Sequence, residues 1–258
     1  MFPPCEAKET CLSVVSHRKL AEVIKLLDAL TDFEIEIGEI IITLNVPEEC
    51  PVGARLIDNV RIFSNLKRRG FADNHNFAYA LSDKKHFLVM NSDIELSLNF
   101  KSLIESSNIS ELPEVWAPIV ITALGVDQPV VPKTISLSFI GRFFPSLFPE
   151  INYYRGSEVI GTVNRGWFSG CCILFTNKSF MLVGGFDPAY IMYYEDVDLS
   201  IAAGQKKVAL NVQTQASIVH AGRRGSRHDL RLLVYHLSSA LYFFVKSVGR
   251  WIRQSARF

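Results

Sequence analysis

The sequence predicts an α/β fold in which a mostly parallel sheet is flanked by helices. Short apolar runs alternate with helical patterns in the first part of the chain, and several runs end in small polar residues. The 258 residues are 48% apolar and 21% charged, with a formal net charge of +1. This is the composition of a folded protein, and the length suits one well-filled domain.

The opening elements follow the order strand, helix, strand. Residues 12 to 16 predict a strand, residues 19 to 30 a helix with apolar positions at helical spacing, and residues 37 to 44 a second, buried strand. Two strands joined in this way are expected to be parallel, through a right-handed crossover. Further strands are expected at 60 to 64 and 86 to 90, with a short helix at 76 to 82 between them.

The second half of the chain is less regular. Prolines interrupt every pattern between residues 113 and 166, which predicts irregular loops. The elements expected after them are a strand at 167 to 175, a brief helix at 177 to 183 ended by Gly184 and Gly185, a helix at 195 to 203 closed by Gly204, a strand pair ending at Val219 and His220, and a long apolar helix at 229 to 248. We expect a catalytic domain over 1 to 228 and a helical extension over 229 to 258.

Basic residues gather at the C-terminal end of the chain. Residues 221 to 258 carry eight arginines and lysines against the single acid Asp229, a charge of +7 that leaves about −6 for the rest. Such a segment suits an anionic surface or a phosphate-bearing ligand, and a solvated tail is the alternative. The helix expected there either rests at a membrane interface or closes the core, which is favoured for Leu233 and Leu237.

The cysteines and the apolar segments indicate a compartment. The five cysteines form no CxxC pair, and their odd number fits a reducing cytoplasm better than a disulfide framework. The first residues do not have the pattern of a signal peptide. The longest uncharged apolar stretch, 232 to 245, is interrupted by polar residues and is short for a bilayer, so we expect no transmembrane segment. We expect no nucleic-acid partner.

Polar side chains are expected along one edge of the sheet, because ligands of such sheets bind beyond the carboxyl ends of the strands. Ser16, Asn45, Ser64 and the cluster Asn91 to Asp93 all follow predicted strands. The aspartate of this cluster, with small polar neighbours, can hold a hard divalent cation. Taken alone, an aspartate after a strand is more often a turn residue or a helix cap.

Three carboxylates, Glu195, Asp196 and Asp198, occupy the opening turn of a predicted helix. The helix dipole favours negative charge there, so capping is one explanation. Three acids within four residues repel one another unless a cation or an acceptor proton is near, and this favours a functional role. Tyr193 and Tyr194 stand directly before them.

Two further segments suit phosphate. His220 leads into a basic loop, where an imidazole can bind a metal while arginines gather phosphate oxygens, although a single histidine is usually structural. Residues 70 to 76 enter a predicted helix, and amide donors at a helix N-terminus suit a phosphate or nucleotide. This second segment lacks the dinucleotide glycine fingerprint, and ordinary turn residues would explain it.

Taken in order, these segments resemble the inverting glycosyltransferase family 2, of GT-A fold, and in particular its bacterial rhamnosyltransferase-like branch. The resemblance runs over nearly the whole chain. The matching segments are LSVVSHR (12 to 18), IIITLNVPE (40 to 48), NLKRRGFADNHNFAYA (65 to 80), FLVMNSDIEL (87 to 96), WFSGCCILFTNKSFMLVGGFDPAYIMYYEDVDLSIAAG (167 to 204) and HAGRRGSR (220 to 227).

The resemblance implies a role for each matching residue. Asp93 would be the metal ligand of a DXD-like element, with His220 completing the binding of Mg2+ or Mn2+. Asp196 would be the general base, and Glu195 would orient the acceptor. The remaining residues implied are Ser16, His17, Asn45, Asn65, Gly70, Asn76, Asn91, Ser92 and Asp93 for the donor nucleotide, Arg224 and Arg227 for the diphosphate, and Trp167, Ser169, Gly170 and Tyr194 for the acceptor and sugar pocket.

The sequence also departs from the family pattern. Asn91 stands where the first acid of the metal element usually lies, and Leu44 or Asn45 stands where an acid commonly follows the second strand. Ala78 replaces a frequent glycine. The first two departures weaken the expected metal affinity and the expected recognition of the base.

The activity that the resemblance implies is the inverting transfer of a sugar from a nucleoside-diphosphate sugar, such as a dTDP-rhamnose-like, UDP or GDP donor. The acceptor would be a saccharide or a lipid-linked molecule of bacterial surface polysaccharide or lipopolysaccharide (O-antigen) synthesis, at the cytoplasmic face of a membrane. Two alternatives stay open. One is a catalytically silent nucleotide- or sugar-binding subunit of a polysaccharide assembly. The other is a nucleotidyltransferase, which usually opens with a glycine-rich loop and a lysine after the first strand, a pattern that SHRKL at 16 to 20 does not have because it contains no glycine.

Overall fold

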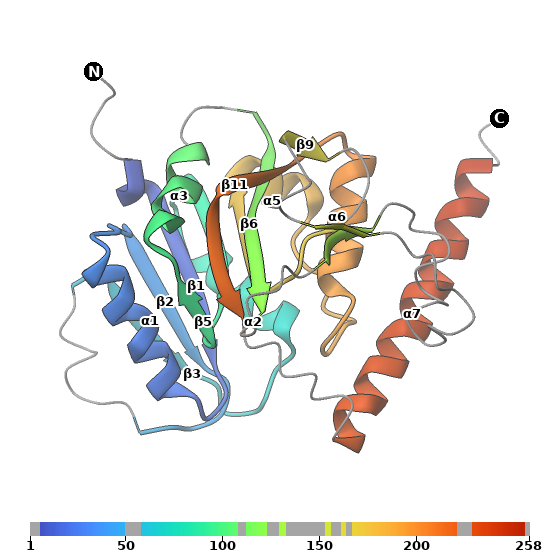
Figure 1. Ribbon diagram of the computed structural model, residues 1–258. Coiled ribbons are helices and arrows are strands. Elements are labelled where there is room, and N and C mark those ends of the chain that lie inside the picture. The colour runs from blue at the N-terminus through green and yellow to red at the C-terminus, as the bar shows by residue number, and fades with distance from the viewer. Residues whose placement is uncertain are drawn as a thin grey trace.

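The computed structural model describes residues 6–49, 58–107, 112–122, 129–132, 153–155, 161–163, 167–220 and 229–255 (Figure 1). Within them, nine strands form one sheet in the order β3-β2-β1-β4-β10-β6-β11-β5, with β9 paired to β11. The strands are β1 (Thr10–Ser16), β2 (Glu39–Leu44), β3 (Val60–Ser64), β4 (His86–Asn91), β5 (Ile94–Leu96), β6 (Glu114–Thr122), β9 (Gly161–Val163), β10 (Cys172–Thr176) and β11 (Ala209–His220), and a separate pair consists of β7 (Pro129–Pro132) and β8 (Tyr153–Arg155).

The sheet is mixed and mostly parallel in its first half. Strands β3, β2, β1 and β4 are parallel, β10 is antiparallel to both β4 and β6, and β6 is parallel to β11. The helical elements are η1 (Glu6–Glu9), α1 (Leu20–Asp32), α2 (Phe71–Leu81), η3 (Leu98–Phe100), α3 (Lys101–Ser107), α5 (Asn177–Val183), α6 (Glu195–Gln205) and α7 (Leu230–Ser255). The predicted α/β class and the parallel pairing of the first two strands are confirmed.

Apolar residues alternate along the parallel strands, so the sheet has a buried core on each face. Leu12 and Val14 of β1 join the cluster that packs under α1 and α3, whereas Cys11 joins the cluster that packs under α2, α5 and α6. Figure 1 shows α1 and α3 on one side of the sheet and α2 on the other. Both clusters hold the strands so that their carboxyl ends meet at a single edge.

Several predicted bounds match, and others differ for identifiable reasons. The strand Val60–Ser64 and the helix Asn177–Val183 have the predicted bounds, and Gly184 ends that helix with a φ of 92°. The helix expected to begin at residue 76 begins at Phe71, whose amide N–H donates to the carbonyl of Ile191 (3.1 Å). This contact comes from a distant segment, so no local pattern reveals it.

The predicted irregularity of residues 113 to 166 was wrong for β6, which contains Pro118. Pro118 lies past the last residue paired with β10, and the register of β11 shifts directly after its partner Gln213. A missing N–H costs little at such an irregularity. Four other elements also differ from their predicted bounds: β10 begins at Cys172, β11 is one strand and not a pair, α6 continues past Gly204 to Gln205, and α7 continues to Ser255.

Helix α7 packs on the domain along one face. Ser239, Ala240 and Phe243 are buried there, and the Ser239 hydroxyl donates to the carbonyl of Met192 (2.8 Å). Leu233 and Leu237 are 38% and 48% exposed, so the prediction that they face the core was wrong. They lie at the border of the buried face, Leu233 about two turns and Leu237 about one turn before Ala240.

Two basic side chains of α7 anchor it. Lys246 Nζ lies 2.7 Å from Asp198 Oδ2, and Arg250 Nη1 lies 2.8 Å from Asp198 Oδ1. Asp187 also pairs with Lys246. The segment Leu230–Arg250, of 21 residues, has a mean hydropathy of 1.3 and is long and apolar enough to cross a membrane. The shorter uncharged stretch from 232 to 245 does not by itself indicate this. The ion pairs hold this helix against the domain.

We predict that Asp198→Asn lowers the free energy of unfolding by about 3 kcal/mol, because it leaves two cations of a nearly buried cluster without their shared carboxylate. Urea unfolding followed by circular dichroism measures this. The exposed Asp28 on α1 provides the control Asp28→Asn, which should change stability by less than about 0.5 kcal/mol. Equal losses in the two variants would contradict the anchoring role.

Candidate active site

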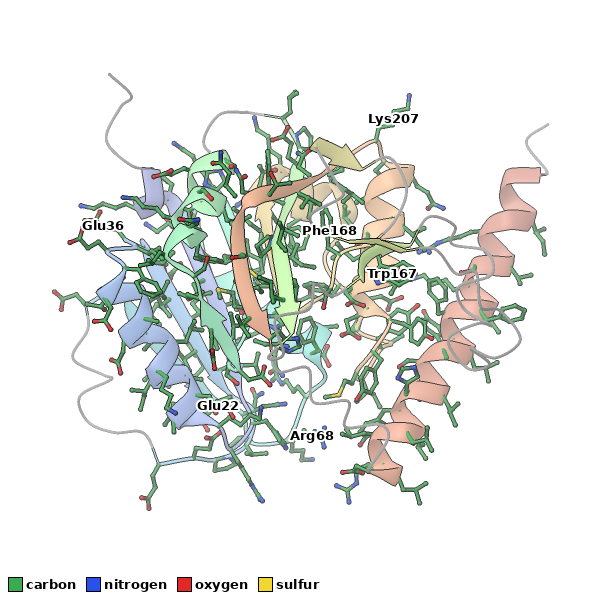
Figure 2. The ribbon with its side chains drawn as sticks, in the orientation of Figure 1. Glu22, Glu36, Arg68, Trp167, Phe168 and Lys207 are labelled. Carbon is green, nitrogen blue, oxygen red and sulfur yellow. The ribbon has the colours of Figure 1, made fainter. Side chains whose placement is uncertain are left out.

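The carboxyl ends of the first parallel strands form one polar edge, as predicted. Val15 is in register with Asn91, and the amide N–H of Asn45 donates to the carbonyl of Ser16 (2.8 Å). The side chains of Glu22 and Arg68 lie at this edge in Figure 2, whereas Glu36 lies at the opposite edge. The predicted donor residues on these strand ends are therefore neighbours.

Asparagine side chains build this edge. Asn45 donates to the carbonyl of Arg69 (3.0 Å) and accepts from its amide (2.8 Å). Asn65 donates to Asn45 Oδ1 (3.1 Å) and to Asn74 Oδ1 (2.7 Å). Buried amide groups of this kind must be paired, and here they fix the loop before α2. The direct contact of Asn45 and Asn65 with a donor stays a prediction.

Two other predicted donor residues contact the loops that precede α6. Asn76 donates to the carbonyl of Phe186 (2.7 Å) and accepts from its amide (3.0 Å). A Cβ on Gly70 would lie 2.9 Å from the carbonyl oxygen of Ile191, so only glycine allows this close approach. The structure brings Gly70 and Asn76 against residues 186 to 191. Their contact with the nucleotide also stays a prediction.

Glu48 is a residue of this edge that the sequence interpretation did not single out. Its carboxylate accepts from the Ser16 hydroxyl (2.8 and 3.0 Å) and from the amide N–H groups of Arg18 (2.7 Å) and Leu20 (3.3 Å). It thus occupies the positive end of the α1 dipole. The neighbouring His17 is largely exposed. The part of its ring that is buried, and then the positive charge of Arg68, lower the pKa of His17. The sequence feature that could have pointed to Glu48 is its position after Pro47, at the end of the segment 40 to 48 that resembles the family.

The structure brings Asp93 and His220 together from distant parts of the chain. His220 Nε2 lies 3.5 Å from Asp93 Oδ1, and Lys19 Nζ lies 3.3 Å from Asp93 Oδ2 and 3.0 Å from Glu22 Oε2. The hydrogen bond with His220 and the charge of Lys19 hold the pKa of Asp93 well below its usual range. The Ser92 hydroxyl contacts Glu22 (3.4 Å). Lys19 and Glu22 were not among the predicted site residues.

Asp93 and His220 offer a carboxylate and an imidazole, both of which are common ligands of divalent cations. Across the described ranges, no group of three or more His, Cys, Asp or Glu side chains gathers in a metal-binding arrangement. Two protein ligands suffice where a substrate diphosphate and water supply the others, which is how Mg2+ is commonly held. The residues therefore fit a cation only together with a phosphate-bearing ligand, and Lys19 already places one positive charge against Asp93.

Asp196 is held by two backbone amides. Its Oδ2 accepts from Gly170 (2.8 Å) and its Oδ1 accepts from Val197 (2.8 Å). A Cβ on Gly170 would lie 3.4 Å from the Asp196 Cβ and 3.3 Å from Phe71 Cζ, so a larger residue would press on both. Each carboxylate oxygen keeps a lone pair in a fixed orientation, which suits a general base.

Glu195 has a different environment from Asp196. Its side chain is buried, and its Oε2 has no hydrogen-bond partner among the described residues. Burial, and then the charge of Asp196, raise the pKa of Glu195 to about 8. The pair therefore divides into a neutral acid and a carboxylate held by amides at neutral pH. Directly before the pair, Tyr193 and Tyr194 have positive φ angles of 72° and 68°.

Cys171 links the two groups of side chains. Its carbonyl accepts from the amide of Asn91 (2.9 Å), and it follows Gly170, which holds Asp196. Burial raises the pKa of the Cys171 thiol to about 12, and the negative charges of Asp196 and Asp93 add to this rise. The hydrogen bonds of residues 170 and 171 thus connect Asp196 to the strand end at Asn91, two residues before Asp93.

Of the predicted acceptor residues, Gly170 contacts Asp196 and Tyr194 directly precedes the acid pair. The amide of Phe168 donates to Ser200 Oγ (3.2 Å), and Trp167 packs against the cluster of Tyr190, Tyr194 and Phe243. Figure 2 shows Trp167 and Phe168 beside α6. Ser169 lies between Phe168 and Gly170. Arg224 and Arg227, predicted for the diphosphate, lie outside the described residues.

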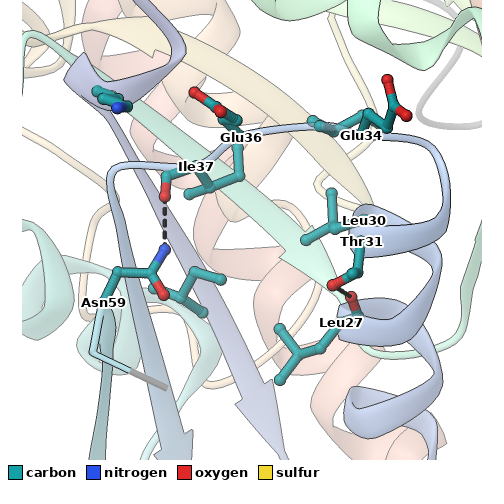
Figure 3. A pocket seen from close by; sticks show the side chains of 10 residues that line it. Leu27, Leu30, Thr31, Glu34, Glu36, Ile37 and Asn59 are labelled. Carbon is teal, nitrogen blue, oxygen red and sulfur yellow. Dashed lines mark hydrogen bonds between the residues drawn. The ribbon is translucent and has the colours of Figure 1, made fainter.

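A pocket of about 400 Å³ lies away from these residues, between α1 and the start of β2 (Figure 3). Leu27, Leu30, Ile37 and Asn59 line it, and the Asn59 side chain donates to the carbonyl of Ile37 (2.6 Å). It opens at the amino-terminal ends of the strands. In open α/β sheets ligands bind at the other edge, so this pocket is not the candidate active site.

The fold is shared with solved glycosyltransferases. A mannosyltransferase from Pyrobaculum calidifontis, in complex with GDP-Man and Mn2+, superposes on 91% of this chain and 64% of its own with a TM-score of 0.56 and 14% identity. GalNAc-T7 with UDP, GalNAc and Mn2+ superposes on 82% of this chain and 43% of its own, with a TM-score of 0.55 and 12% identity. The S. aureus TarS 1-349 structure gives a TM-score of 0.53 at 13% identity, over 82% and 60% of the two chains.

This chain has the GT-A glycosyltransferase fold. Its sequence is rhamnosyltransferase-like: over 115 residues it is 34% identical to the N-acetylglucosaminyl-diphospho-decaprenol L-rhamnosyltransferase of Mycobacterium tuberculosis. The match takes in 43% of this GT-A chain and 37% of that protein, so the chain spans little more than a third of the curated relatives that it matches. No protein-family profile matches the sequence. The predicted fold and resemblance are confirmed.

We predict that Glu195→Gln stabilises this GT-A domain increasingly as the pH rises. The raised pKa means that the stability contributed by the protonated glutamate is complete below its ordinary pKa of 4.5 and is lost as the pH rises through about 8. Glutamine stays neutral, so the difference in unfolding free energy should grow by at most about 1.4 kcal/mol per pH unit over this window. Urea unfolding at several pH values measures it.

The exposed Glu105 of α3 provides the matched control Glu105→Gln, which should run parallel to the wild type. A pH-independent difference for Glu195→Gln would contradict a buried, neutral Glu195.

Proposed function

We propose that this chain is an inverting glycosyltransferase that moves a sugar from a nucleoside-diphosphate sugar to a saccharide or lipid-linked acceptor of bacterial surface polysaccharide synthesis. The observation that carries the proposal is the contact of Asp93 with His220 just after β4, whose end is joined through the backbone of residues 170 and 171 to the amide that holds Asp196. The relative from M. tuberculosis, whose name joins L-rhamnose to a diphospho-decaprenol acceptor, supports a rhamnose-type donor and a lipid-linked acceptor.

The proposed reaction is a single displacement. Asp196 accepts the proton of an acceptor hydroxyl while that oxygen forms a bond to the anomeric carbon, on the face opposite the nucleoside diphosphate. The bond from the anomeric carbon to the phosphate oxygen breaks, and its electron pair leaves with the diphosphate. The configuration of the anomeric carbon inverts. Neutral Glu195, beside Asp196, would donate a hydrogen bond that orients the acceptor.

Charge on the departing diphosphate needs a positive partner. Asp93 and His220 would hold Mg2+ or Mn2+, which when bound supplies Lewis-acid stabilisation of that charge. The Mn2+ in the two solved relatives supports this proposal. Lys19, within 3.3 Å of Asp93, supplies a fixed cation at the same place, and Arg224 and Arg227 would add to it. We propose that the reaction takes place at the cytoplasmic face of a membrane.

A catalytically silent binding subunit is the second candidate, and Asn91 in place of an acid favours it. The amide-held Asp196 argues against it, because a binding subunit has no need of an oriented base at the acceptor side. A nucleotidyltransferase is disfavoured by the loop after β1, which carries Lys19 against Asp93 and no glycine.

The first test is a thermal-shift screen of nucleoside diphosphates and nucleotide sugars, with and without Mn2+. A ligand that binds only the folded state raises its melting temperature. We expect a shift with one donor class, larger with Mn2+, and a smaller Mn2+ effect in Asp93→Asn and His220→Ala. Slow release of the nucleotide from that donor by the purified protein would exclude the silent subunit. No shift with any donor would contradict the proposed function.

We predict that Asp196→Asn lowers turnover about 100-fold to 10,000-fold, because general-base catalysis contributes by this factor. The donor-induced thermal shift should stay unchanged, since Asp196 lies on the acceptor side. Asp83→Asn, at an exposed position before β4, is the matched control and should keep full turnover. Near-normal turnover of Asp196→Asn would remove this residue from the role of base.

A further inference from the structure

One face of α7 carries large apolar side chains that are substantially exposed to solvent. They recur at spacings of three and four residues and are between 38% and 76% exposed. We call them the outer face of α7: Leu230, Leu233, Val234, Leu237, Leu241, Phe244, Val245, Val248 and Ile252. The outer face is about 33 Å long, at 1.5 Å per residue. Exposed apolar surfaces of this extent mark interaction sites.

The opposite face of the same helix is already occupied. Ser239, Ala240 and Phe243 pack on the domain, and Lys246 and Arg250 pair with Asp198. Figure 1 shows α7 at the side of the molecule, next to α6. The orientation of the helix is therefore fixed, and the outer face points away from the domain.

The charge of α7 selects among possible partners. Residues 230 to 255 contain no acidic residue, and Arg231 is exposed near the beginning of the outer face. A second copy of α7 would bring basic residues together with no acid on either helix to offset them. A membrane surface that contains anionic lipids offers hydrocarbon to the outer face and negative charge to Arg231 beside it.

The ion pairs of α7 also decide how it meets a bilayer. A helix of this length and hydropathy is able to cross a membrane, but crossing would draw Lys246 and Arg250 away from Asp198, which is nearly buried in the domain. Breaking a buried ion pair costs several kcal/mol. The contacts favour a helix that lies along the surface.

We propose that the outer face of α7 binds the surface of an anionic lipid bilayer. This inference rests on the proposed function only for the lipid-linked acceptor. Binding to the bilayer is measured without catalysis. The inner face of the helix contacts the residues directly before the acid pair, because the ring centroids of Phe243 and Tyr194 are 5.4 Å apart and the Ser239 hydroxyl donates to the carbonyl of Met192. The acceptor residues then lie about one helix diameter, roughly 10 Å, from the lipid.

The test is co-sedimentation of the full chain with vesicles of equal parts phosphatidylglycerol and phosphatidylcholine. We expect binding that weakens with salt and is much lower on pure phosphatidylcholine. Leu241→Glu with Phe244→Glu should lower the bound fraction at least tenfold. Met181→Glu is the matched control, because Met181 on α5 is 65% exposed and Leu241 is 64% exposed. Melting curves establish that each variant is folded.

Each other outcome overturns the proposal. Equal binding of the double variant and the wild type would place the lipid contact elsewhere. A concentration-dependent dimer that the double variant loses, without vesicle binding, would assign the outer face to a second copy. Protein that resists carbonate extraction would show a spanning helix. Loss of donor binding in the screen above leaves vesicle binding unaffected, so the two proposals fail separately.

Discussion

The site depends on one short stretch of backbone, Gly170 to Cys172, where the two halves of the chain meet. Its amide at Gly170 holds Asp196, its carbonyl at Cys171 accepts from Asn91, and Cys172 pairs with Met90 in the antiparallel ladder between β10 and β4. Three consecutive residues thus connect the parallel half-sheet to α6. The connection between Asp196 and the end of β4 therefore runs through one backbone–backbone hydrogen bond, Asn91 to Cys171, and one bond from the Gly170 amide to the Asp196 carboxylate.

The elements with strong local patterns could be predicted from the sequence, and those set by distant contacts could not. Strand Val60–Ser64 follows from its apolar run, and helix Asn177–Val183 follows from its local pattern and from Gly184, which ends it. The early start of α2 depends on Ile191, and β6 tolerates Pro118 only because of the shift in its partner strand. Neither fact has a local signature.

The candidate site shows the same division. Family motifs pointed to Asp93, Asp196 and His220, and the structure brings Asp93 and His220 to within 3.5 Å. Lys19 and Glu48 escaped notice because each acts through a partner far along the chain, Asp93 and Ser16. The pairing of Asp198 with α7 escaped for the same reason, since three neighbouring acids look alike in sequence although one is structural.

Tyr193 and Tyr194 enter α6 through two successive left-handed backbone conformations, which cost about 1–2 kcal/mol each for residues other than glycine. Glycines would remove this cost, but they would also remove the aromatic ring of Tyr194 that packs on Phe243 and His236. The chain thus keeps a strained turn at Tyr193 and Tyr194, which is held by packing against α7. Because α6 begins at Glu195, a displacement of α7 would act, through the ring of Tyr194, on the backbone that carries the acid pair.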